Sequence, residues 1–308
     1  MTATTTTSLS ASPGRGLRRV KNNAATVLVT LAFGIALVPL VWLLWTVISK
    51  GWHAITRNGW FTQDVGTRTY RDPGGGALHA IVGTLEQVAL CSLISVPIAV
   101  MVGIYLVEYG RGPLAKATTF MVDILSGVPS IVAALFIYAV FITTFHGERG
   151  GWLVSLALVL LMIPVIVRTT EEMLKLVPNE LREASYALGV PKWKTISRIV
   201  IPTALTGIIT GIVLGIARVA GETAPLLILV GYTDNFNDNL FGNGFQGSLP
   251  GMINAQVANL GNNRSFTGQP IHNYAVDRMW GAALTLIIIV MALNLIARIL
   301  GRYTRFEY

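Results

Sequence analysis

Long apolar runs alternate with short polar segments along most of the chain. The runs cover residues 24–48, 81–107, 119–145, 152–167, 203–230 and 279–300. A helix needs about 20 mainly apolar residues to cross the hydrocarbon of a bilayer. The fourth run is the shortest, and it continues as a polar helical tail through Lys175. The pattern predicts an all-α integral membrane protein with six transmembrane helices.

Polar and helix-breaking residues interrupt two of these runs. Glu86, Gln87 and Pro97 lie in the second, so one end or face of that span must meet protein or water. Gly127 and Pro129 interrupt the third and free backbone groups, which are tolerated at depth only beside protein or water. Such N–H groups could contact an oxyanion. A packing kink explains the same two residues equally well.

The fifth run carries a glycine ladder followed by two charges. Gly207, Gly211, Gly215, Arg218 and Glu222 follow one another at helical spacing, which predicts that they share one face. Small residues every fourth position let another helix approach closely. Charges at membrane depth usually mark pathways or ion pairs. Arg218 and Glu222 therefore either neutralise each other, or Arg218 contacts an anion while Glu222 holds it in place.

Residues 177–201 form a polar island between the fourth and fifth runs. Leu181, Ala184 and Leu188 recur at helical spacing, and Gly189 follows the last of them, as a left-handed helix stop requires. Pro191 then opens a second, basic helix. The island is predicted to be a helix, a glycine corner and a second helix. An ordinary amphipathic connector between two spans is the alternative.

Composition and charge agree with a membrane protein and orient it. Only 12% of the 308 residues are charged, against about 25% in soluble domains. The net charge of +8 does not indicate nucleic acid, because the basic residues lie between the spans. The N-terminal arm, the 109–117 and 168–201 loops and the C-terminal end hold most of them. By the positive-inside rule both termini are cytoplasmic.

This orientation predicts on which side of the membrane the segments of the chain lie. Residues 1–23 are predicted to be a disordered cytoplasmic arm, and 24–308 a single membrane domain. Segments 51–79 and 231–277 are the sizeable outside surfaces.

No catalytic or metal-binding constellation emerges. The chain contains no G-x-x-x-x-G-K-[ST] motif, so it is not expected to bind ATP through a P-loop of its own. The four histidines are far apart in sequence and are predicted to be solvated loop residues outside the membrane. The single cysteine, Cys91, is predicted to be a packing residue. We expect neither an enzyme nor a metal protein.

The polar island resembles the signature loop of ABC-importer permeases, E-A-A-x3-G-x9-I-x-L-P. The residues that match are Glu183, Ala184, Gly189, Ile199 and Pro202, while Ser185 replaces the second Ala and Ile201 the Leu. The resemblance implies a type I permease fold in which this loop carries the coupling helix. It further implies two partner ATP-binding subunits, which bind ATP and Mg, contacted through Glu183, Ala184, Ser185, Gly189 and Pro202.

Two further stretches are similar to the phosphate-specific, PstA-type permeases. They are Ser126-Gly127-Val128-Pro129-Ser130-Ile131-Val132 and Gly221-Glu222-Thr223-Ala224-Pro225. The resemblance implies import of inorganic phosphate through the bacterial plasma membrane. It also implies a homologous second permease subunit and a phosphate-binding protein outside. The expected pathway residues are Arg218, Glu222, Ser126, Gly127 and Ser130.

Two alternatives stay open on the sequence. The first is a permease for another oxyanion, molybdate or sulfate, because Arg218 does not distinguish among these anions. The second is an autonomous channel or ion-driven carrier, which would have no use for the signature loop.

Overall fold

The computed structural model of the chain describes residues 15–261 and 272–303, and over these two ranges the protein is helical without a β-strand. The α-helices are α1 (Arg15–Ile55), α2 (Leu78–Ile104), α3 (Gly112–Gly127), α4 (Ser130–Ile137), α5 (Gly151–Lys175), α6 (Asn179–Ala187), α7 (Lys192–Thr195), α8 (Ile201–Ala220), α9 (Ala224–Leu229), α10 (Leu249–Val257) and α11 (Tyr274–Tyr303). Wider π-helical turns, η1 (Tyr105–Tyr109), η2 (Tyr138–Thr144) and η3 (Ile196–Val200), continue α2 and α4 and join α7 to α8.

The chain divides into two units, residues 1–49 and 50–308. The described part of the first unit is the stretch of α1 from Arg15 to residue 49. Residues 15–23 are therefore helical, and the predicted disorder of this stretch is wrong. The rest of the predicted arm, residues 1–14, lies outside the described residues. Because apolar side chains occur on every side of α1, the helix suits an apolar environment on all its faces.

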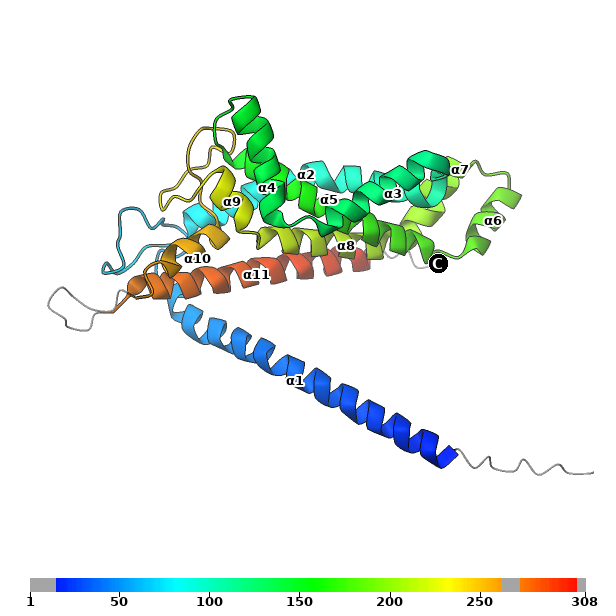
Figure 1. Cartoon of the computed structure of the whole chain (residues 1–308), viewed down its shortest axis with the longest axis horizontal. Coiled ribbons are helices and arrows are strands. Elements are labelled where there is room, and N and C mark those ends of the chain that lie inside the picture. The colour runs from blue at the N-terminus through cyan, green and yellow to red at the C-terminus, as the bar shows by residue number, and fades with distance from the viewer. Residues whose placement is uncertain (1–14, 262–271, 304–308) are drawn as a thin grey trace, which may run out of the picture. The chain divides into compact units, whose positions relative to one another are not determined.

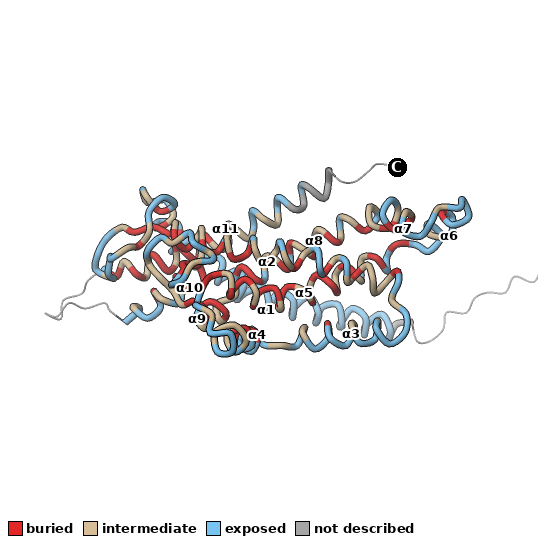
Figure 2. Tube along the Cα trace, turned by 90° about the horizontal axis from the view of Figure 1, so that it is seen from above, coloured by how far each residue is buried: buried red, intermediate tan, exposed pale blue. Residues whose placement is uncertain are grey.

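Five described helices are long and apolar enough to span a membrane, and α3 with α4 makes a sixth if the bent pair counts as one. In the second unit, α2, α5, α8 and α11 run alongside one another (Figure 1). Helix α5 contacts α2, α8, α3, α4 and α9, and its buried residues form the centre of the largest apolar cluster (Figure 2). The core of this unit therefore lies around α5.

The two ends of the second unit carry different segments. Helices α6 and α7 lie at one end, while α9 and α10 lie at the other (Figure 1). The polar island 177–201 and the described part of the long segment, residues 231–261 and 272–277, are thus separated by the length of the apolar helices, as the six-span pattern predicts.

The third predicted span is broken. Helices α3 and α4 meet at an angle of 107° around Val128 and Pro129. The Val128 N–H still donates to the Leu125 carbonyl, but Pro129 has no N–H to continue the ladder. The interruption expected at Gly127 and Pro129 is confirmed, and it is a sharp corner.

The fifth span ends earlier than predicted. Helix α8 stops at Ala220, and α9 begins only at Ala224. Pro225 cannot donate to the carbonyl of Gly221, four residues earlier, and its ring would clash with it. Glu222 consequently lies in the break, and the prediction that it shares a helical face with Arg218 is wrong.

The glycine ladder of α8 packs against α5 as expected. A Cβ on Gly207 would collide with Met173, and one on Gly211 with Thr169. A Cβ on Gly215 would lie 3.3 Å from Ile166. These three positions let the backbones of α5 and α8 approach closely.

Polar residues of the second span are satisfied by protein. Gln87 Nε2 donates to Gln246 Oε1 at 2.9 Å, and Gln246 Nε2 donates to Glu86 Oε2 at 2.7 Å. Gln246, which makes both contacts, comes from the long segment between α9 and α11, so α2 does meet protein here. Cys91 is fully buried and lies 3.6 Å from the sulfur of Met162, in agreement with a packing role.

One of the four histidines is not solvated. His79 lies in α2, is fully buried and sits 2.8 Å from the hydroxyl of Tyr232. The other three, His53, His146 and His272, are exposed. The prediction failed at His79 because α2 begins at Leu78 and includes it.

Candidate substrate pathway and coupling site

A cavity of about 260 Å³ opens where α3, α5 and α8 meet. Its polar lining comes from Ser126 on α3, Arg168 and Thr169 on α5, and Arg218 on α8. Its apolar lining is Leu125, Val128, Leu161, Pro164 and Val165. The corner after α3 therefore forms one wall of a polar cavity among apolar helices.

The two hydroxyl groups of the cavity already donate to their own helices. Ser126 Oγ donates to the Val122 carbonyl at 2.8 Å, and Thr169 Oγ1 donates to the Val165 carbonyl at 2.9 Å. The hydroxyl protons are thus already used in hydrogen bonds within the helices. The guanidinium groups of the two arginines are therefore the strong donors that line the cavity.

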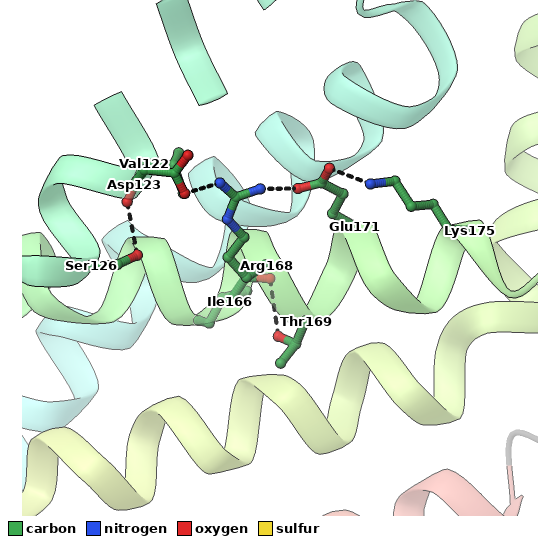
Figure 3. A network of polar contacts seen from close by, with 8 residues as sticks. All are labelled: Val122, Asp123, Ser126, Ile166, Arg168, Thr169, Glu171 and Lys175. Atoms are coloured by element: carbon green, nitrogen blue, oxygen red, sulfur yellow. Dashed lines mark hydrogen bonds and ion pairs between the residues drawn. The ribbon is translucent and has the colours of Figure 1, made fainter. Parts of the chain in front are cut away.

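The two arginines differ in their partners. Arg168 forms ion pairs with Asp123 and with Glu171, and the Glu171 carboxylate also holds Lys175 at 2.6 Å (Figure 3). Among the described residues, the Arg218 side chain has neither an ion-pair nor a hydrogen-bond partner. The cavity thus contains one balanced guanidinium and one that is open to an anion.

Arg218 forms no ion pair with Glu222 among the residues that the structure describes. The Glu222 N–H donates to the Val219 carbonyl at 3.2 Å, which turns the chain at the end of α8. Mutual neutralisation of the two side chains does not account for Arg218.

The structure brings together only part of the predicted pathway set. Ser126 and Arg218 line the same cavity, whereas Gly127, Ser130 and Glu222 do not. The sequence pattern predicts Arg168 as a cytoplasmic charge in the polar helical tail of the fourth span, and it does not single out Arg168 or Thr169 as pathway residues. Because that helix is predicted to continue through Lys175, its repeat places Arg168 on the face of Leu161 and Val165.

The polar island folds as a helix, a corner and a second helix. Gly189 has φ +74°, its N–H donates to the Tyr186 carbonyl, and the Val190 N–H donates to the Ser185 carbonyl. This pair of bonds is a Schellman motif, which needs a left-handed residue at the glycine position. The predicted glycine stop is confirmed.

Two contacts brace this loop. Ser185 Oγ lies 2.8 Å from Thr195 Oγ1, so the buried serine ties α6 to α7. Arg182 reaches back from α6 to the Glu108 carboxylate at 2.9 Å, and Lys192 donates to the Glu108 carbonyl. Both short helices are therefore anchored at the end of η1.

Apolar side chains of the loop point outward. Leu188 is 83% exposed and Trp193 65%, and Glu183, Ala184 and Gly189 are exposed beside them. Pro202 lies in the first turn of α8, directly after η3. Exposed apolar groups together on a braced surface are typical of a contact site for another protein.

Comparison with known proteins shows to which family the chain belongs. The family model of binding-protein-dependent transport system inner membrane components matches residues 95–305. The phosphate transport system permease protein PstA 1 of Mycobacterium tuberculosis H37Rv is 52% identical over 91% of this chain and 87% of the relative. PstA of Pasteurella multocida is 38% identical over 92% of this chain and 95% of the relative.

Solved structures share the fold at lower identity. An inward-facing structure of the MetNI methionine ABC transporter matches with a TM-score of 0.57 and 19% identity, over 74% of this chain and 95% of that one. A bacterial alginate ABC transporter matches with a TM-score of 0.59 and 14% identity, over 97% and 100%. Fold and sequence together define a transmembrane permease of the type I ABC-importer kind. Within that class, the chain belongs to the family of binding-protein-dependent transport system inner membrane components, in the group of PstA phosphate transport system permease proteins.

Proposed function

We propose that this chain is the permease subunit of an ATP-driven importer that moves inorganic phosphate across the bacterial plasma membrane into the cell. The observation that carries the proposal is the cavity lined by Arg168 and Arg218 in a PstA-type chain. A guanidinium presents a planar fork of donors that matches an oxyanion. Because a charged side chain is expensive within the membrane, such residues usually serve a pathway.

The energy comes from partner subunits in this proposal. Two ATP-binding subunits hold ATP and Mg, and each permease subunit offers one signature loop to them. In this chain the contact is made by the exposed surface around Glu183, Ala184 and Leu188. A homologous second permease subunit completes the pathway.

Both termini and the 177–201 loop face the cytoplasm in this proposal, and a phosphate-binding protein docks on segments 51–79 and 231–277. The excess of basic residues in the loops that would be cytoplasmic supports this orientation. In a Cys91→Ala background, an impermeant thiol reagent added to intact cells should label Asn235→Cys but not Lys194→Cys; Asn235 is exposed and Lys194 is partly exposed, so neither position is shielded by burial alone. The reverse labelling would contradict the orientation.

Uptake of [³²P]phosphate into proteoliposomes tests the function itself. The assembled complex, with ATP inside and the binding protein outside, should accumulate phosphate, and omission of the ATP-binding subunits should abolish uptake. Phosphate entry without them would favour an autonomous channel or carrier. Stronger competition by molybdate or sulfate than by unlabelled phosphate would assign a different oxyanion.

A further inference from the structure

The ion-pair network around Arg168 contains two carboxylates that are not equivalent (Figure 3). Glu171 lies three residues further along the same helix, its side chain is 12% exposed, and it also binds Lys175. Asp123 comes from α3, its side chain is 59% exposed, and Arg168 is its only ion-pair partner among the described residues. Glu171 is thus a fixed partner of Arg168, and Asp123 an exchangeable one.

Asp123 lies at the rim of the arginine cavity and does not line it. It precedes Ser126, which does line the cavity, by one helical turn on α3. Helix α3 then ends at Gly127, where a Cβ would meet no atom within 4 Å, and the chain turns by 107°. The Asp123 side chain is itself mostly exposed, so its carboxylate has open space into which it can swing away from Arg168.

The charges of the cavity explain why such a carboxylate is needed. Two guanidinium groups that line a cavity among apolar helices are costly to leave without counter-charge. An incoming phosphate supplies this negative counter-charge. The phosphate also repels a carboxylate that is already paired with Arg168. Phosphate and Asp123 therefore exclude each other from this guanidinium.

We propose that Asp123 is an internal counter-anion, which occupies Arg168 in the substrate-free permease and competes with phosphate for it. This inference rests on the proposed function of the cavity and adds a positioning residue to it. When phosphate leaves toward the cytoplasm, Asp123 returns to Arg168 and opposes rebinding from that side. The Asp123 carboxylate thus favours the release of phosphate to the cytoplasm over its retention in the cavity.

Equilibrium binding tests the competition without requiring turnover. [³²P]Phosphate is titrated against the assembled, nucleotide-free complex in nanodiscs, without the binding protein. Asp123→Asn should bind phosphate about fivefold more tightly than wild type, the size expected for a partly exposed ion pair. Asp123→Glu keeps the charge and should stay within about twofold of wild type. Glu172→Gln, an exposed carboxylate that has no ion pair with Arg168, serves as the matched control.

A variant that lacks Arg168 shows whether the tighter phosphate binding of Asp123→Asn depends on this arginine. In Arg168→Gln, the additional change Asp123→Asn should no longer tighten binding, because the group for which the two anions compete is gone. In proteoliposomes, phosphate preloaded on the ATP side should inhibit uptake by Asp123→Asn at about fivefold lower concentration than uptake by wild type.

Unchanged or weaker binding by Asp123→Asn would overturn the proposal. Unchanged binding would mean that the Asp123–Arg168 ion pair has only a structural role. Weaker binding would mean that Asp123 is a direct ligand of phosphate. The proposed function fails separately, if the wild-type complex neither binds phosphate nor takes it up.

Discussion

The carboxylate of Glu108 accepts two hydrogen bonds from the guanidinium of Arg182, at 2.9 and 3.1 Å, across 74 positions of the chain. Glu108 lies in η1 at the end of the second span, and Arg182 lies on α6. Their side chains are only 5% and 13% exposed. Arg182 also donates to the carbonyls of Leu174, in the last turn of α5, and of Val177, just after α5. One side chain thus joins α6 to the ends of two membrane helices.

Breaking this pair should loosen α6 from the membrane helices. Glu108→Gln removes one charge and leaves a buried guanidinium without its counter-ion, which costs about 3 kcal/mol. We expect a lower unfolding temperature of the purified chain and ATP hydrolysis that no longer drives uptake. The double variant Glu108→Gln with Arg182→Gln should recover part of the stability, since neither charge is then left alone.

Glu180→Gln is the matched control for this experiment, because Glu180 is an exposed carboxylate in the first turn of α6. It should leave both the unfolding temperature and the coupling near wild type. Equal losses in Glu108→Gln and Glu180→Gln would show that the buried pair has no special part in coupling.

The corner at Gly189 should matter more for coupling than for stability. Gly189→Ala places a Cβ at φ +74°, which costs about 1–2 kcal/mol although no atom lies within 4 Å. Gly112→Ala is a matched control, with φ +77° and the same open surroundings at the start of α3. Both variants should lose similar stability, but only Gly189→Ala should lose phosphate-stimulated ATP hydrolysis. Equal hydrolysis by the two would make the loop a passive connector.

Two carboxylates between the apolar helices, Asp234 and Asp72, should change the stability of the folded protein with pH in opposite directions. Burial raises the pKa of Asp234, and the hydrogen bond from Tyr232 offsets this only in part. The folded protein therefore favours the protonated acid, and stability falls as pH rises from the unfolded pKa, about 3.9, to the raised one. Asp234→Asn should unfold at a higher temperature than wild type at pH 7.5, with no difference below about pH 4.

Asp72 provides the opposite case. Hydrogen bonds from the backbone N–H and hydroxyl of Thr69 lower the pKa of Asp72. Its stabilising effect is present above the unfolded pKa and is lost as pH falls through the lowered one. Asp72→Asn should thus unfold at a lower temperature than wild type at pH 7.5. The same direction of change in both asparagine variants would contradict these assignments.

Periodic and local features of the chain could be predicted from sequence. The glycine repeat of Gly207, Gly211 and Gly215 predicts close helix packing, because spacing on a helix is set by geometry alone. The left-handed Gly189 is equally local, since only the few residues around it decide the turn. The break at Gly221–Thr223 was missed although Pro225 signals it.

The residue pairings that form the cavity and brace the polar island 177–201 could not be predicted from the sequence. Asp123 meets Arg168 across 45 positions, and Glu108 meets Arg182 across 74. Such contacts depend on how α3, α5 and η1 pack, and no residue spacing encodes that packing. For the same reason Arg168 was predicted only as a cytoplasmic charge in the helical tail of the fourth span, although α5 carries it into the cavity.

Uptake by arginine variants tests the central claim, that the arginine cavity is the phosphate path. ATP-driven [³²P]phosphate uptake is measured in proteoliposomes and normalised to assembled complex. Arg218→Gln should lower the rate about 10- to 100-fold, the loss of a charge-assisted hydrogen bond. Arg218→Lys should be partly active, because an ammonium lacks the planar fork. Adding Glu222→Gln should not rescue Arg218→Gln, and Arg111→Gln, an exposed arginine outside the cavity, should transport normally. Near-normal uptake by Arg218→Gln in a fully assembled complex would contradict the account.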